Sequence, residues 1–544
     1  MLIKLFKKIT QHQYFSAVVL ALIFLIAAYL RLVNLNWDQS LALHPDERNI
    51  ALAVSRLNWP EQTDPAFYAY NGFPLFLADL SSQLMSNLTN DVSWQNDLGK
   101  INLITRTYSA IFSLISVIFF YLIAKKIFSK NTVLIVTWLA ATTVTLIQHA
   151  HFGVTESLLV LELLMLTWLS ICFIQEKKQR FLLAQALVLG LSLATKTSAL
   201  PFAIIPALSI WLVNKFNFKA LRQMSAVVVV SFLVFYLTSP HTFHYFQQFL
   251  STMRYEQAIA SGQQKIFYTM QFIGTIPYLF QLKTLLWQTS PLFLLIAGGG
   301  LYWFFKNFKK YRVLWPLILF SIIYFLYIGS WYAKFNRYLM PVIPALILLA
   351  GVAIEQFPQK RPQKILISLM VITHGLWALA FIHIYQTEDV RLTASHWIED
   401  NIASDSVLLH EERDVRLPVV FSQGKNYQYS LLELYPVDSQ EKINNLSQQL
   451  SSGDYLLIAS QRLYRTIPKS ADHPDTKNYY QLLFAGELGY QKITEFSSYP
   501  KLLGLDINDE RAEETFTVFD HPHIFIFKNV DHLSQEELFK KIRP

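Results

Sequence analysis

The chain has 544 residues, of which 53% are hydrophobic and only 15% are charged, and its formal net charge is +8. Soluble domains carry about 25% charged residues, so these proportions exclude an ordinary soluble protein of this size. The basic side chains form short clusters between apolar segments, which indicates a membrane topology signal and not a nucleic-acid partner. A single cysteine, Cys172, excludes a disulfide framework and a thiolate metal site.

Long apolar segments recur through residues 1–385 and predict about eleven membrane-spanning helices. The first runs from about 14 to 33 after Lys4, Lys7 and Lys8. No small-residue cleavage site follows it, so we expect a retained helix and not a cleaved signal. The other spans are expected at about 103–124, 132–150, 154–174, 181–199, 200–214, 225–239, 286–305, 313–330, 338–355 and 365–384.

Basic clusters recur in alternate loops between these segments, in phase with the N-terminal lysines; the loop after the eighth span carries Lys306, Lys309, Lys310 and Arg312. By the positive-inside rule, the N-terminus is predicted to be cytoplasmic in a multi-pass plasma (inner) membrane protein. The extracytoplasmic side then holds two long loops and the whole region after the last span. The loops are expected at about 34–100 and 240–285.

Shorter elements are expected on that extracytoplasmic side. Amphipathic patterns predict interfacial helices at about 50–57, 76–85 and 243–260. After 385, short apolar runs predict strands at 407–410, 455–459 and 524–527, with helical patterns at 394–402, 440–450 and 479–488 between them. Strands that alternate with helices favour a small α/β domain with a largely parallel sheet. The fold class is therefore a polytopic α-helical membrane protein (1–385) with an extracytoplasmic soluble α/β domain (386–544).

Four consecutive residues of the first outer loop, His44-Pro45-Asp46-Glu47, carry the strongest functional signal. Adjacent carboxylates beside a bilayer are costly unless they are paired, hydrated or used in chemistry. Pro45 favours an extended His44 and suits the first turn of a helix. We therefore expect Asp46 and Glu47 at a helix start, where the helix dipole favours their ionised forms. An open alternative is that the carboxylates simply cap the helix and that Arg48 pairs with one of them.

Other polar residues are expected at the same membrane face. Tyr70 and Asn71 belong to an aromatic stretch of the first outer loop, and His149, His151 and Glu156 precede the fourth span. Two histidines and a glutamate keep a divalent metal site possible, although paired loop histidines are more often hydrogen-bond formers.

Three basic residues are expected at the outer ends of later spans. Lys196 ends the fifth span, where snorkelling of its side chain to the surface is the simplest explanation. Lys334 and Arg337 precede the tenth span. An arginine there can snorkel too, but its planar fork suits bidentate binding of a phosphate.

With these motifs the chain resembles the GT-C glycosyltransferases. It is most similar to the family 39 and protein O-mannosyltransferase-like group, with the aminoarabinose transferases as relatives. The resemblance rests on His44-Pro-Asp-Glu47, Asn71-Gly-Phe-Pro74, 151–156 and 334–341. Residues 394–402 and 517–522 resemble the C-terminal domain of bacterial members, so the resemblance spans nearly the whole chain.

The resemblance implies a glycosyltransferase that moves a monosaccharide from a polyprenyl-phosphate carrier to an acceptor hydroxyl on the extracytoplasmic side, with inversion. Asp46 would be the catalytic base, with Glu47 orienting it or the acceptor, and Arg337 would bind the carrier phosphate with Lys334. The substrate-binding residues would be His44, Arg48, Tyr70, Asn71, His151 and Glu156. No cofactor is required, although a divalent metal is possible. The implied partners are the lipid-linked sugar, an acceptor protein, lipid or glycan, and the bilayer.

The sequence also departs from its relatives. The Lys-Pro-Pro motif of the aminoarabinose transferases is Gly72-Phe73-Pro74 here, so the phosphate contact of that lysine is not carried over. Glu156 stands where relatives often have aspartate. Three alternatives remain open at this point: a transporter or flippase of a lipid-linked substrate, a lipid-linked oligosaccharide ligase or polymerase, and a non-catalytic envelope assembly protein.

Overall fold

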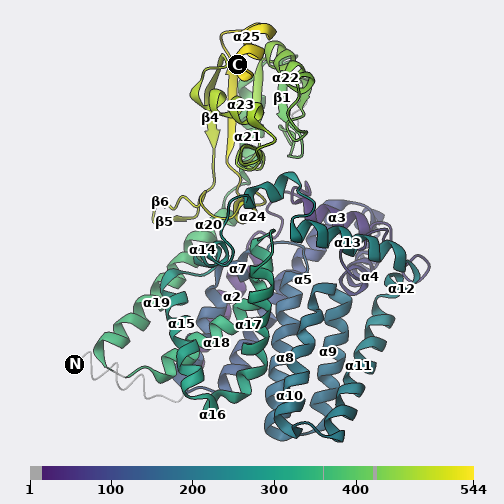
Figure 1. Ribbon diagram of the computed structural model, residues 1–544, viewed down its shortest axis with the longest axis vertical. Coiled ribbons are helices and arrows are strands. Elements are labelled where there is room, and N and C mark those ends of the chain that lie inside the picture. The colour runs from purple at the N-terminus through teal and green to yellow at the C-terminus, as the bar shows by residue number, and fades with distance from the viewer. Residues whose placement is uncertain (1–14, 359, 421–424) are drawn as a thin grey trace.

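The computed structural model describes residues 15–358, 360–420 and 425–544. Figure 1 shows a bundle of long helices with a smaller α/β unit at one end, which holds the C-terminus. The helical part contains, in order, α2 (Phe15–Leu32), α3 (Pro45–Val54), α4 (Gly72–Thr89), η1 (Val92–Gln95), α5 (Leu98–Lys125), α6 (Lys130–Thr142), α7 (Val144–Gln148), α8 (Glu156–Glu176), α9 (Gln179–Thr195), η2 (Thr197–Ala203), α10 (Ile204–Asn214), α11 (Phe218–Thr238), α12 (Pro240–His244), α13 (Phe246–Ser261), η3 (Phe267–Phe272), α14 (Leu279–Gln288), α15 (Pro291–Lys306), α16 (Phe308–Tyr311), η4 (Arg312–Leu314), α17 (Trp315–Gly329), η5 (Asn336–Val342), α18 (Ile343–Gln356), α19 (Arg361–Phe381) and α20 (His383–Gln386).

The predicted membrane-helix class is confirmed, but the number of eleven spans is not. Within the described residues, seven helical segments are long and apolar enough to cross a membrane, or eight if α14 and α15, bent by 119°, form one span. The remaining expected spans are present as shorter pieces: α2 and α9 are short apolar helices, and α6 stops before α7 at the extended Thr143. The bend between α14 and α15 follows from an extended Ser290 before Pro291, because the residue before a proline avoids the helical region.

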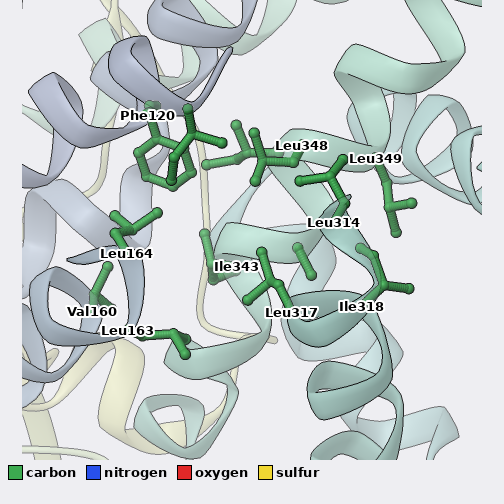
Figure 2. Close-up of a cluster of buried hydrophobic side chains, with 14 of the residues drawn as sticks. Phe120, Val160, Leu163, Leu164, Leu314, Leu317, Ile318, Ile343, Leu348 and Leu349 are labelled. Carbon is green, nitrogen blue, oxygen red and sulfur yellow. The ribbon is translucent and has the colours of Figure 1, made fainter. Parts of the chain in front are cut away.

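The core of the bundle lies around α8 and α18, which are mostly buried, whereas α11 is mostly exposed. Val160, Leu163 and Leu164 of α8 meet Ile343 and other apolar side chains from α5, α17 and α18 in one buried cluster (Figure 2). A helix that is hydrophobic on all sides is buried in the interior. Because α8 also packs against η5, Glu156 at the start of α8 and Arg337 in η5 lie at the same end of the bundle.

The amphipathic segments predicted in the outer loops are helical. The first two correspond to α3 and α4, which pack against each other and against α5, and the third to α12 and α13. Helix α3 therefore presents the His44-Pro45-Asp46-Glu47 motif on the bundle, at the end that faces the α/β unit (Figure 1).

The α/β unit contains the predicted strands and helices, but its sheet is mixed. Two of the four strand pairings are parallel, β1 with β2 and β1 with β3, and the other two are antiparallel, β7 with β3 and β4 with β7. The prediction of a largely parallel sheet is therefore wrong, because β7 runs antiparallel to both of its neighbours, β3 and β4. The sheet order is β2-β1-β3-β7-β4. The elements are α21 (Val390–Asn401), β1 (Val407–Glu411), β2 (Gln428–Leu432), α22 (Gln440–Ser452), β3 (Tyr455–Ile458), η6 (Ile467–Lys469), α23 (Pro474–Ala485), β4 (Tyr490–Phe496), β5 (Lys501–Leu502), β6 (Leu505–Asp506), α24 (Glu514–Thr517), β7 (Ile524–Asn529) and α25 (Gln535–Ile542).

Candidate active site

The first turn of α3 is capped by a histidine. His44 is extended, as its position before Pro45 predicts, and its Nδ1 accepts the backbone N–H of Asp46 at 3.2 Å and that of Glu47 at 3.5 Å. An imidazole nitrogen accepts a hydrogen bond only when it is unprotonated. Burial lowers the pKa of His44 and so favours this neutral form. The cap is thus the imidazole and not a carboxylate, which leaves both carboxylates free for other partners.

Asp46 forms an ion pair with Arg337, through Oδ2 and Nη1. The side chains come from α3 and η5 and are about a quarter exposed, 25% for Asp46 and 27% for Arg337. Burial raises the pKa of Asp46, but the positive charge of Arg337, together with those of Lys196 and Arg462, outweighs it, so this pKa lies below its ordinary value. An ionised carboxylate, accessible from outside, is therefore held beside a guanidinium.

Glu47 lies in a different environment. Its carboxylate contacts Arg106 of α5 at 2.5 Å and accepts the backbone N–H of Gly153 at 2.5 Å, while Arg106 also contacts Asp38 at 2.8 Å. These three ionised side chains are buried, and the ring of Trp37 covers Arg106 at 4.4 Å. These contacts tie Glu47, and with it the first turn of α3, to α5 and to Gly153. Arg106 and Asp38 were not among the predicted site residues. A buried carboxylate needs a cation, so an arginine inside the second predicted span was the available signal.

Arg48 does not pair with either carboxylate of the motif. Its exposed side chain donates from Nε to the carbonyl oxygen of Ala42 at 3.1 Å. This contact closes the turn that leads into α3.

A second ion pair joins the start of α8 to the residue that follows α9. The Nζ atom of Lys196 contacts Oε1 of Glu156 at 3.0 Å and lies 4.8 Å from the centre of the Tyr70 ring. The charge of Lys196 also contributes to the low pKa of Asp46, which places the two pairs near each other. Snorkelling to the surface is therefore the wrong explanation for Lys196, because its side chain turns inward to Glu156.

Asn71 and the two histidines make local contacts. Asn71 donates from Nδ2 to the carbonyl of Leu193 at 2.6 Å, which ties the start of α4 to the end of α9. The two ring nitrogens of His151 lie 2.9 Å from the carbonyls of Ile147 and Val33, and Nδ1 of His149 lies 2.9 Å from that of Thr145. Within the described part of the chain, no group of three or more His, Cys, Asp or Glu residues is placed to hold a metal ion, and His149, His151 and Glu156 do not converge as one.

Lys334 is buried, and its described contacts are with Tyr332 and Phe272. Its Nζ donates to the carbonyl of Tyr332 at 2.8 Å and lies 5.8 Å from the centre of the Phe272 ring. Burial lowers the pKa of Lys334. Of the two residues predicted to bind phosphate, only Arg337 is thus found beside Asp46.

The α/β unit contributes residues 513–521 to the neighbourhood of the site. Glu513 accepts the backbone N–H of Asn336 at 3.2 Å, directly before Arg337. Glu514 binds Nε of Arg462 at 3.0 Å, and the charge of Arg462 acts on Asp46. Phe519 packs on the ring of His44 with a centroid distance of 4.1 Å. None of these contacts was predicted, although residues 517–522 carry part of the family resemblance.

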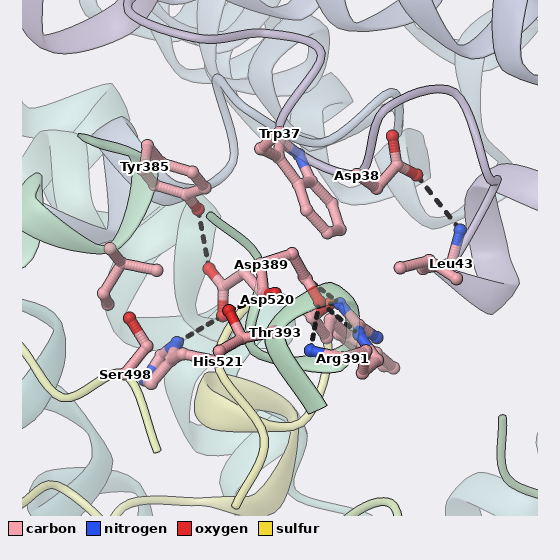
Figure 3. Close-up of polar contacts among 12 residues, drawn as sticks. Trp37, Asp38, Leu43, Tyr385, Asp389, Arg391, Thr393, Ser498, Asp520 and His521 are labelled. Carbon is pink, nitrogen blue, oxygen red and sulfur yellow. Dashed lines mark hydrogen bonds and ion pairs between the residues drawn. The ribbon is translucent and has the colours of Figure 1, made fainter. Parts of the chain in front are cut away.

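The same segment is fastened to the bundle by buried polar contacts (Figure 3). Asp520 accepts from the Tyr385 hydroxyl at 2.6 Å and from Nε2 of Gln148 at 3.1 Å, and its other oxygen lies 2.5 Å from Nδ1 of His521. His521 also contacts Asp509 at 2.9 Å. Burial lowers its pKa, but the two carboxylates outweigh this and raise the pKa of His521 to about 10. The imidazolium therefore stays charged near neutral pH and holds the segment in place.

Comparison with known families supports the motif-based interpretation. Residues 98–244, from α5 to α12, match the model of the family described as dolichyl-phosphate-mannose-protein mannosyltransferase. The chain is similar to these glycosyltransferases. The predicted GT-C resemblance and the predicted enzyme class are confirmed by this match, and the matched segment holds Arg106, Glu156 and Lys196.

Solved structures also show similarity. The chain is 13% identical to ArnT from Cupriavidus metallidurans bound to undecaprenyl phosphate, over 96% of this chain and 99% of that chain, with a TM-score of 0.46. The chain is 12% identical to the archaeal oligosaccharyltransferase AglB from Archaeoglobus fulgidus. This match covers 91% of this chain and 75% of that chain, with a TM-score of 0.48. The chain is 13% identical to the Pmt1–Pmt2 protein O-mannosyltransferase complex of S. cerevisiae. This match covers 43% of this chain and 34% of that chain, with a TM-score of 0.34. A comparison with curated protein sequences finds no match.

Proposed function

We propose that the protein transfers a monosaccharide from a polyprenyl-phosphate carrier to an acceptor hydroxyl group on the extracytoplasmic side of the plasma (inner) membrane, with inversion at the anomeric carbon. The observation that carries this proposal is the contact between Asp46 and Arg337, a base and a phosphate-binding group in one partly open site. Their elements, α3 and η5, lie at the end of the helical bundle, where a lipid-linked donor would present its headgroup.

In the proposed reaction, Asp46 takes the proton of the acceptor hydroxyl. The acceptor oxygen forms a bond to the anomeric carbon while the bond from that carbon to the phosphate oxygen breaks. The electron pair of the broken bond stays on the polyprenyl phosphate, and Arg337 neutralises the charge that develops there. A guanidinium has five N–H donors, so Arg337 has donors to offer the phosphate beyond the one that contacts Asp46.

The second ion pair supplies a further cation to this scheme. Lys196 is held by Glu156 and by the face of Tyr70, and its charge acts on Asp46. We therefore assign the role first expected of Lys334 to Lys196. The scheme requires no metal, because cationic side chains serve the phosphate. Glu47 and His44 position α3, and the acceptor is a protein, lipid or glycan that carries a free hydroxyl group.

The test is sugar release from a panel of radiolabelled polyprenyl-phosphate monosaccharides, with the purified protein in membranes and an envelope extract as acceptor. General base catalysis contributes about 10²–10⁴-fold, so Asp46→Asn should reduce transfer by this factor. The matched control is Asp91→Asn, which removes a loop carboxylate that pairs with Lys100, and it should retain transfer. A donor that crosses the membrane intact, equally well in both variants, would refute the proposal and indicate a flippase.

A further inference from the structure

The short hairpin β5–β6 has an apolar tip that is open to the surroundings. Leu503 and Gly504 form its two-residue turn, both with positive φ (50° and 84°), and Leu503 is 96% exposed. Leu505, next in the chain, is 74% exposed. Two-residue turns with positive φ favour asparagine followed by glycine, and a bulky residue in this conformation is uncommon. Neither turn geometry nor packing against the described residues explains a leucine at this position.

The position of the hairpin connects it to the membrane part of the chain. Strand β5 lies against α19 and α20, and the Ser498 hydroxyl just before it is 3.3 Å from that of Thr387 just after α20. In Figure 1 the hairpin projects sideways at the level where the α/β unit meets the bundle. The tip therefore lies at the rim of the bundle, and not on the part of the α/β unit remote from it.

The neighbouring helix α19 exposes an apolar stripe that leads toward the hairpin. Five of its exposed apolar residues are three or four positions apart, as on one face of a helix: Ile365, Leu369, Ile372, Leu376 and Leu379; Leu366 beside the first is also exposed. In a membrane-spanning helix such a stripe faces lipid. The last of these residues is two positions before the end of α19, so the lipid-facing surface continues up to the element on which β5 lies.

The hairpin itself has the polarity of an interfacial anchor. Lys501 and Asp506 form a 3.0 Å ion pair across its base, while the leucines are at its tip. A charged base and an apolar tip match the headgroup and acyl layers of a bilayer. We propose that Leu503 and Leu505 insert into the membrane interface beside α19 and anchor the α/β unit to the bilayer surface. This inference is independent of the proposed reaction.

Spin labelling of the full-length protein in lipid nanodiscs tests the proposal. With the single buried cysteine replaced (Cys172→Ser), a spin label is attached in the variant Leu503→Cys, and the matched control is Val437→Cys, 63% exposed elsewhere on the α/β unit. Accessibility to apolar oxygen and to a polar nickel chelate is measured for each. We expect the label at 503 to favour oxygen several-fold more than the label at 437 does.

Two results would overturn the inference. Equal, chelate-dominated accessibility at both positions would show that the tip lies in water. Low accessibility of position 503 to both reagents would show that protein covers it, either a second copy or a partner. As a further check, Leu503→Asn suits the turn and should preserve folding, while it should reduce protection of the hairpin backbone from proteolysis in nanodiscs relative to the unsubstituted protein.

Discussion

Asp46 and Glu47 are neighbours in the chain but have opposite environments. Asp46 is a quarter exposed and pairs with a single cation, Arg337, from a distant part of the sequence. Glu47 is fully buried, and it shares Arg106 with Asp38. Consecutive residues of a helix point about 100° apart, so the turn that exposes one carboxylate directs the next into the bundle. One carboxylate is thus available for chemistry because the other fixes the helix.

The buried cluster should therefore affect stability, and the open pair should affect activity. Arg106→Gln leaves Asp38 and Glu47 buried without their shared cation, and we expect unfolding free energy to fall by about 3–5 kcal/mol. Arg337→Gln removes a partner from a partly solvated pair, so stability should change by only about 0–1 kcal/mol. Thermal unfolding of both variants in detergent measures the difference. Equal destabilisation would contradict the distinction between the two sites.

Activity and its pH dependence should respond to Arg337. Loss of a charge-assisted hydrogen bond costs about 1.5–3 kcal/mol, so Arg337→Gln should lower kcat/KM by about 10–150-fold.

Arg337 holds the pKa of Asp46 low, so activity in the unsubstituted protein should be lost only as the pH falls through that depressed value. In the variant the largest of the charges that lower this pKa is gone while burial still raises it, so the pKa should rise and the acid limb of kcat/KM should move to higher pH. An unchanged acid limb would show that Asp46 is not the base.

The smallest expected effect concerns the contact between the α/β unit and α3. Phe519 packs on His44, and aromatic pairs contribute about 0.5–1.5 kcal/mol, so Phe519→Ala should reduce kcat by about 2–10-fold. If Phe519 acts by holding His44 in place as the N-cap of α3, the double variant Phe519→Ala/His44→Ala should be no slower than His44→Ala alone. Phe516 is the matched control, because it is buried in the same segment but packs on Phe381. The effects of Phe516→Ala and His44→Ala on kcat should be additive in the double variant. Additive effects of Phe519→Ala and His44→Ala would refute the coupling between Phe519 and His44.

Several parts of the fold follow directly from local patterns. Apolar runs located the helices of the bundle core, and after 385 short apolar runs located β1, β3 and β7 and helical patterns located α21, α22 and α23. Strands β2 and β4 and helix α25 were not predicted. The span count and the sheet type were less predictable. The bend before Pro291 and the break at Thr143 shorten helices that look continuous by composition, and strand direction depends on pairing between distant segments.

For the site, the sequence by itself determined the chemical groups. Asp46 lies at the start of a helix because His44 and Pro45 favour that conformation locally. Only the tertiary structure decided which charges meet: Asp46 with Arg337, Glu47 with Arg106, and Lys196, not Lys334, with the site. The physical reason is that ion pairs in a low-dielectric interior are selected by burial and mutual distance across the fold. Neither quantity is encoded in the spacing of residues along the chain.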